Sequence, residues 1–180
     1  MRRGGVLLSL ALLLAAACGP QEVGDMTLTI ASSAFEADAT IPVRHTCDGA
    51  DLSPPLRWEG VPEGAQSLAL IADDPDAPVG TWVHWILYGL DPRTDHLSEG
   101  IEPREILPDG SRQGTNDFRR IGYGGPCPPP GGAHRYFFKL YALDAPLSLA
   151  PGARKAELLD AMEGHVLARG ALMGRYARSR

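Results

Sequence analysis

The segment Leu68-Ala-Leu-Ile-Ala-Asp-Asp-Pro-Asp-Ala-Pro78 decides how this chain of 180 residues is interpreted. Its first five residues form an apolar run with the length of a buried strand, and a polar turn follows directly. Pro75 and Pro78 fix the backbone φ angle and remove two N–H donors, so we expect a stiff turn. A second apolar run, Trp82–Leu90, comes shortly afterwards. The pattern predicts two strands separated by a rigid acidic turn.

Further elements follow from the same kind of pattern. Met26–Ile30 alternates as a strand does, and Arg135–Leu143 is an aromatic strand. Apolar residues at helical spacing predict a helix over Lys155–Arg169, with Ala171–Arg178 as a second short helical piece. The segment Asp91–Gly125 is rich in Gly, Pro and charge. We expect it to be mostly loop with one short strand, and a loop of that length is usually functional.

The composition describes one acidic globular domain. Hydrophobic residues make up 44% of the chain, and 17 basic against 22 acidic residues give a net charge of −5. Such a chain is too apolar for disorder. Its acidity argues against nucleic-acid binding, because nothing compensates phosphate repulsion.

The N-terminus has the pattern of an export signal. Arg2 and Arg3 precede an apolar run from Val6 to Ala17, which is too short to span a bilayer, and Cys18 follows. This resembles a bacterial lipoprotein signal, which implies cleavage before Cys18 and acylation of its thiol. We expect residues 1–17 to be the signal peptide, 18–25 a tether and 26–180 the domain. The protein is then anchored in the cell envelope and faces the periplasm or the exterior, with plain secretion as the alternative.

Two other cysteines remain, Cys47 and Cys127. In an oxidising compartment an even pair is compatible with a disulfide, and two buried thiols are the alternative.

Two polar clusters flank predicted strands. The first is the turn Asp73–Pro78 with His84 beyond it, and the second is the Gly/Pro-rich segment Gly122–Tyr136, which contains His134. Taken singly, a strand histidine is most often a core residue and Asp-Pro-Asp is most often a turn. The combination of two histidines, carboxylates and a braced loop at strand ends favours a site.

These segments resemble the signatures of the phosphatidylethanolamine-binding protein family, in particular its bacterial branch, often labelled Raf-kinase-inhibitor-like. The resemblance rests on motifs that occur in the family's order: Asp74-Pro-Asp-Ala-Pro78 with His84-Trp85, Gly124-Gly-Pro-Cys-Pro-Pro129 with His134-Arg-Tyr136, Thr46-Cys-Asp-Gly49, Ser53-Pro-Pro-Leu-Arg-Trp58, Gln113-Gly-Thr-Asn-Asp-Phe118 and Ala161-Met-Glu-Gly-His165. It implies a mainly β fold (α+β) in which a large antiparallel sheet packs on a smaller one, with helices near the C-terminus.

The resemblance also implies a small anion pocket. By motif position its residues are Asp74, Asp76, His84, Gly125, His134 and Tyr136. We expect Asp74 to accept a hydrogen bond from one of the two histidines and to favour the protonated ring, while an N–H near Gly125 adds a donor. Phosphate or a phospholipid headgroup should then bind more tightly as the pH falls through about 6.5. No cofactor, metal or catalytic residue is expected.

Three classes of function compete. The first is a lipid-anchored binding protein that captures a small anion or headgroup and inhibits or regulates a protein partner. The second is a hydrolase or lyase that uses the His/Asp cluster, with a metal in one version. The third is a structural envelope protein with a vestigial pocket.

Overall fold

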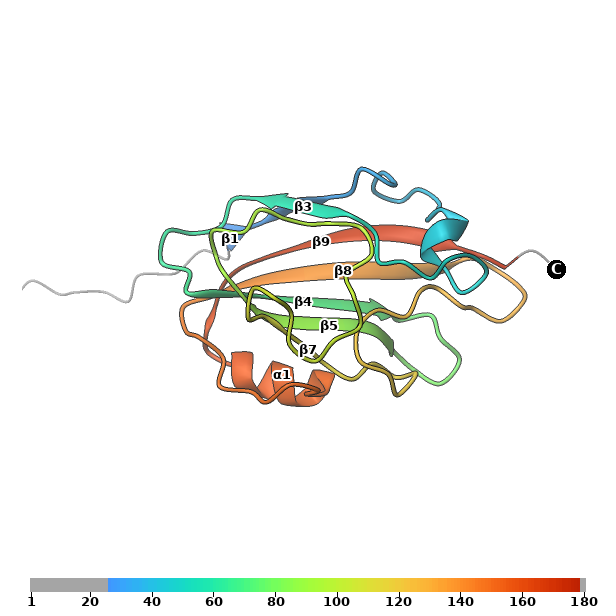
Figure 1. The fold of residues 1–180 in the computed structure, drawn as a ribbon. Coiled ribbons are helices and arrows are strands. Elements are labelled where there is room, and N and C mark those ends of the chain that lie inside the picture. The colour runs from blue at the N-terminus through green and yellow to red at the C-terminus, as the bar shows by residue number, and fades with distance from the viewer. Residues whose placement is uncertain (1–25, 179–180) are drawn as a thin grey trace, which may run out of the picture.

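The computed structural model describes residues 26–178, and in them two β-sheets dominate (Figure 1). The larger sheet has six strands in the order β1-β9-β8-β4-β5-β7, and the smaller has three in the order β2-β3-β6. All strand pairs are antiparallel except β1 with β9. The strands are β1 Met26–Thr27, β2 Thr29–Ala31, β3 Leu56–Glu59, β4 Ser67–Asp74, β5 Trp82–Leu90, β6 His96–Leu97, β7 Arg112–Gln113, β8 His134–Leu143 and β9 Val166–Tyr176. The predicted mainly β fold of a large and a small sheet is confirmed.

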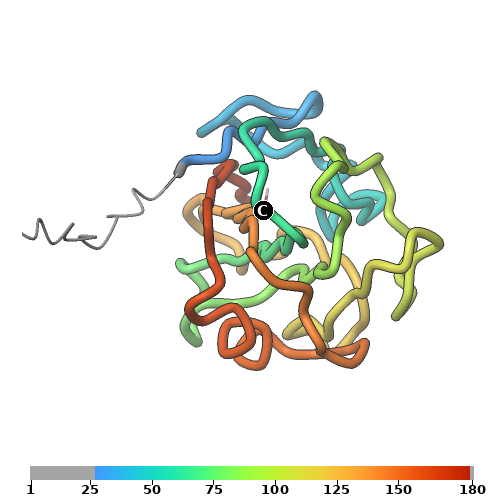
Figure 2. The backbone as a smooth tube through the Cα atoms, turned by 90° about the vertical axis from the view of Figure 1, so that its left-hand side faces the viewer, coloured from blue at the N-terminus to red at the C-terminus, as the bar shows by residue number. Residues whose placement is uncertain are grey.

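The large sheet is buried on both faces. Figure 2 shows it as a middle layer, with the small sheet on one side and α1 (Lys155–Met162), the one α-helix of the described residues, on the other. A short 3-10 helix, η1, spans Val43–His45. Side chains of β4 alternate between the two cores: Leu70 packs toward the small sheet with Trp58, whereas Ile71 packs toward the helix with Leu158. Strand β4 is buried along its whole length, because it lies between two long strands and under a layer on each face.

The C-terminal prediction was wrong in part. Helix α1 ends at Met162, and Val166–Tyr176 forms strand β9 instead of the last helical turn and the second helical piece. Gly164 has a φ of 77°, which ends the helix. Along β9, Ala168, Leu172 and Tyr176 are buried on one face, a spacing that also fits a helix. Pairing with β8 over its whole length decides for strand.

Short strands were also missed. Leu56–Glu59 forms β3, and the predicted loop Asp91–Gly125 contains β6 and β7 where one short strand was expected. A two-residue strand shows no periodicity, so only its pairing reveals it.

The signal peptide (1–17), the tether (18–25) and the acylation at Cys18 lie outside the described residues, 26–178. Within that range, no helix is long and apolar enough to cross a membrane.

A buried carboxylate connects the helix to the sheet. Asp73, near the end of β4, is 0% exposed, and its oxygens lie 2.7 and 3.0 Å from the Lys139 ammonium and 2.5 Å from that of Lys155. The two lysine side chains are only partly buried. The lysines can therefore reach water on their own, but Asp73 cannot.

We predict that the double variant Lys139→Met/Lys155→Met loses about 3–5 kcal/mol of unfolding free energy, because it leaves a buried charge without a partner. Each single variant should lose much less, since the other lysine remains. Urea unfolding of the four proteins measures this. Adding Asp73→Asn to the double variant should recover part of the loss. Strictly additive single losses would contradict the shared-carboxylate account.

Candidate functional site

The sheet register brings three of the expected site residues together. Strands β4 and β8 are antiparallel and Asp73 pairs with Phe137, so the end of β4 lies beside the start of β8. Asp74 and His134 therefore become neighbours although 60 residues separate them. His84 lies on β5, on the other side of β4. All three line one cavity with a volume of about 200 Å³.

Asp74 orients His134. The Asp74 side chain is almost completely buried, and its Oδ2 lies 2.8 Å from Nδ1 of His134. Its Oδ1 accepts a hydrogen bond from the backbone N–H of Asp76 at 2.8 Å. Because a carboxylate only accepts, the proton of His134 lies on Nδ1 whenever the ring is neutral. Its Nε2 is then the nitrogen left for a ligand.

His84 is held by hydrogen bonds with Gly124. Its Nδ1 lies 2.6 Å from the carbonyl oxygen of Gly124, and its own carbonyl accepts the Gly124 N–H at 2.9 Å. The carbonyl only accepts, so Nδ1 donates and Nε2 is again free. Burial lowers the pKa of His84, although the Gly124 carbonyl and the charge of Asp74 act in the opposite direction.

The expected hydrogen bond between Asp74 and one of the two histidines is present, and its donor is His134, whereas His84 uses the Gly124 carbonyl. Burial of the His84 ring disfavours its protonated form. The cause is desolvation, which a motif in the sequence does not reveal.

Three of the expected residues, Asp76, Gly125 and Tyr136, do not line the cavity. Asp76 binds Arg135 through two side-chain hydrogen bonds of 2.7 and 2.9 Å, and this partner lowers the pKa of Asp76 to about 2. It thus ties the acidic turn to the start of β8. The N–H of Gly125 donates to Oδ1 of Asp51 at 2.6 Å. The expectation that this N–H would be open to a ligand is therefore corrected.

Gly125 lies where no side chain fits. A Cβ there would come within 2.5 Å of the carbonyl oxygen of His45 and 2.7 Å of Asp51. The wall formed by residues 123–127 is held further by the hydrogen bond from the Tyr123 hydroxyl to the His45 carbonyl and by the Cys47–Cys127 disulfide. Of the two states left open for these cysteines, the structure has the bridged one.

Aromatic rings pack around His84, and two polar atoms among them lack partners. The rings of Tyr136 and Phe118 pack edge-on against the imidazole, with their ring centroids 5.2 and 5.3 Å from its centroid. Among residues 26–178, two buried side-chain polar atoms have no hydrogen-bond partner: Nε1 of Trp82, which lines the cavity, and the hydroxyl of Tyr136. Burial and the nearby Asp74 carboxylate raise the pKa of that hydroxyl, so it remains a donor. Buried polar groups without partners are rare and commonly await a ligand or a water.

Sequence reasoning missed several residues of the site. Trp82 and Phe118 line the cavity, and Asp51 holds its wall. Phe118 belongs to the motif Gln113–Phe118, but it has no polar group that would have marked it as a site residue. Within the described range, no group of three or more His, Cys, Asp or Glu side chains is placed to hold a metal ion.

Comparisons with known proteins identify the family of this chain. The family model "Phosphatidylethanolamine-binding protein" matches residues 31–177. A UPF0098 protein of Methanothermobacter thermautotrophicus is 53% identical over 151 residues, which are 84% of this chain and 99% of that protein. The crystal structure of a putative phosphatidylethanolamine-binding protein homolog from Chlamydia trachomatis superposes with a TM-score of 0.78 at 41% identity, covering 86% of this chain and all of that one.

A second crystal structure, Escherichia coli YbcL, described as a new member of the mammalian PEBP family, also has a TM-score of 0.78, at 30% identity over 87% of this chain and all of its own. The fold, the family model and the relatives agree over nearly all of the described residues. The chain belongs to the phosphatidylethanolamine-binding protein family.

Proposed function

We propose that the protein binds a small oxyanion, such as phosphate or the phosphate of a phospholipid headgroup, in the cavity between His84 and His134. The observation that carries the proposal is that both rings commit Nδ1 to a protein acceptor and keep Nε2 for the same cavity. Fixing one nitrogen of an imidazole sets the tautomer and the direction of the other. A small, rigid cavity of about 200 Å³ suits a headgroup and not a large substrate.

An unpartnered donor supports an oxyanion over other ligands. Trp82 lines the cavity, and its Nε1 is desolvated and has no hydrogen-bond partner among residues 26–178. A ligand oxygen that accepts from it removes the cost of a buried group without a partner, about 1–3 kcal/mol. Charge-assisted hydrogen bonds of this kind are also stronger than neutral ones.

Anion binding is coupled to proton uptake at His84. The pKa of His84 lies below 6.5 in the free protein because of burial. An anion beside Nε2 favours the protonated ring and raises this pKa in the complex. Binding therefore takes up a proton between the two pKa values, and the affinity rises as the pH falls. Because the free-state pKa is depressed, the rise continues below pH 6.5.

We further propose that the mature protein is a lipoprotein of the cell envelope. The support lies in the sequence: Arg2 and Arg3, the apolar run Val6–Ala17 and Cys18 directly after it. A cavity that takes a headgroup phosphate is then positioned next to the lipids of the membrane that anchors the chain.

We predict that sulfate, which stays a dianion over the range, binds about tenfold or more tightly at pH 5.5 than at pH 8, because each proton taken up contributes up to a factor of ten per pH unit. Titration of labelled mature protein, following the ring signals of His84 and His134 by NMR, measures the affinity. Phosphate and phosphoethanolamine in parallel show whether the headgroup amine adds to binding.

The variant His84→Gln should bind sulfate weakly and with little pH dependence, since its side chain does not titrate. His96→Gln is the matched control, because His96 is an exposed residue paired with Asp95 outside the cavity. Equal affinity at both pH values would reject proton-linked binding, and silent rings in all titrations would reject the anion site.

We predict that the full-length chain, expressed in a bacterium with lipoprotein processing, partitions into the detergent phase of a Triton X-114 extract and incorporates labelled palmitate. Cys18→Ser removes the thiol that would be acylated, so this variant should move to the aqueous phase and lose the label. Cys18 lies outside the domain, so its loss should leave folding unchanged. Wild-type protein without label would contradict the anchor.

A further inference from the structure

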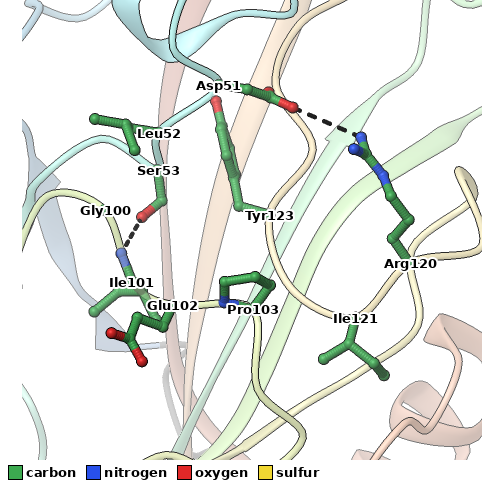
Figure 3. Close-up of a pocket in the computed structure, with 10 residues that line it drawn as sticks. All are labelled: Asp51, Leu52, Ser53, Gly100, Ile101, Glu102, Pro103, Arg120, Ile121 and Tyr123. Carbon is green, nitrogen blue, oxygen red and sulfur yellow. Dashed lines mark hydrogen bonds and ion pairs between the residues drawn. The ribbon is translucent and has the colours of Figure 1, made fainter.

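A second, larger cavity is lined by Tyr123, at the start of the wall formed by residues 123–127, whereas Cys127, at its end, lines the anion cavity. It has a volume of about 410 Å³, within the range of small-molecule sites, and shares no lining residue with the anion cavity. Three segments enclose it: residues 51–53, residues 100–103 and residues 120–123 (Figure 3). Its lining combines apolar side chains, among them Leu52, Ile101 and Ile121, with a few polar ones.

Two side-chain donors of this cavity keep hydrogen-bonding capacity. The Arg120 guanidinium makes no hydrogen bond with any residue of the described range, and its contact with a carboxylate is an ion pair of 3.7 Å with Asp51. It rests on the Phe118 ring, 5.3 Å from the centroid. The Ser53 hydroxyl is buried and accepts the N–H of Ile101 at 2.9 Å, while its own proton has no acceptor in residues 26–178.

Several acceptors of the cavity, in contrast, already have partners. Oδ1 of Asp51 accepts the Gly125 N–H, and its Oδ2 faces Arg120 at 3.7 Å. The Glu102 carboxylate pairs with Arg104 at 2.5 Å, and the Glu102 carbonyl accepts the side-chain amide of Gln113. Donors with capacity left, beside acceptors that already have partners, favour a ligand that brings acceptor oxygens of its own.

The positions of the two donors set the shape of that ligand. In Figure 3, Ser53 and Arg120 lie on opposite sides of the Tyr123 ring, with Ile121 and Pro103 below. The Tyr123 hydroxyl donates to the His45 carbonyl, so the ring serves as an apolar surface. A fitting molecule therefore has a charged end at Arg120 and an apolar body against Tyr123.

We propose that this cavity is a second binding site, which takes a small carboxylic acid with an apolar body. The carboxylate binds the Arg120 guanidinium, the apolar part packs on Tyr123 and Ile121, and Ser53 donates to an oxygen at the far end where the ligand has one. One peptide group connects the linings of the two cavities. Its N–H, on Gly125, donates to Asp51, and its carbonyl, on Gly124, accepts from Nδ1 of His84.

Hexanoate is the probe that tests the site, with hexanol lacking the charge and acetate lacking the apolar body. Titrations of the mature protein are followed by NMR at the Ile101 and Gly125 amides and the Arg120 Nε signal. Hexanoate should shift these signals saturably, and hexanol and acetate should bind at least about tenfold more weakly, because each loses one of the two contact types.

The variant Arg120→Met keeps the aliphatic stem and removes the charge, so its affinity for hexanoate should fall about tenfold or more. Arg119→Met is the matched control and should bind as the wild type does; a well-dispersed spectrum checks that both variants fold. Equal binding of hexanoate and hexanol, unchanged affinity in Arg120→Met, or shifts confined to His84 and His134 would each overturn the proposal. The sulfate titration is read at the two histidine rings, so failure of one site is distinguishable from failure of the other.

Discussion

The arrangement of the molecule depends on two consecutive buried carboxylates at the end of the central strand β4. Successive side chains of a strand point to opposite faces, so Asp73 meets the lysines on the helix side and Asp74 meets His134 on the cavity side. Neither carboxylate is free to turn to water, because β5, β8 and the layers above and below cover the strand. Each therefore needs its partner at a fixed place. The same constraint connects the helix to the sheet and orients the His134 ring beside the cavity.

Residues that belong to contiguous, regular segments were predictable. Strands β4, β5 and β8 follow from apolar runs bounded by turns, and Asp74, His84 and His134 stand at the ends of those runs or in them. The prediction failed where the outcome depends on pairing between distant segments. Leu172 and Tyr176 are four residues apart, a spacing that puts them on one face of a helix and also on one face of a strand. Only the pairing of this segment with β8 decides between the two. The lowered pKa of His84 was not predictable for a related reason, because desolvation depends on everything that packs around the ring.

Two glycines also show that contacts between distant segments are not predictable from the sequence. Gly125 was expected to bring a backbone donor to the ligand, but its lack of a side chain serves a close approach to His45 and Asp51. Gly170 on β9 likewise has the Leu28 carbonyl oxygen 2.1 Å from where a Cβ would lie. A sequence shows that a glycine is present and not which neighbour requires it. Asp51 belongs to none of the motifs found in the sequence. In the structure it accepts the Gly125 N–H and faces Arg120.

The two proposed sites differ in chemistry because their linings differ. In the proposed anion site, the volume is small and the donor on Trp82 is desolvated, which favours recognition by charge and hydrogen bonding. In the proposed site at Arg120, the guanidinium is half exposed and the volume is twice as large, so the proposal needs an apolar body to supply the rest of the binding energy. One peptide group connects the two linings, because its N–H, on Gly125, donates to Asp51 and its carbonyl, on Gly124, accepts from Nδ1 of His84.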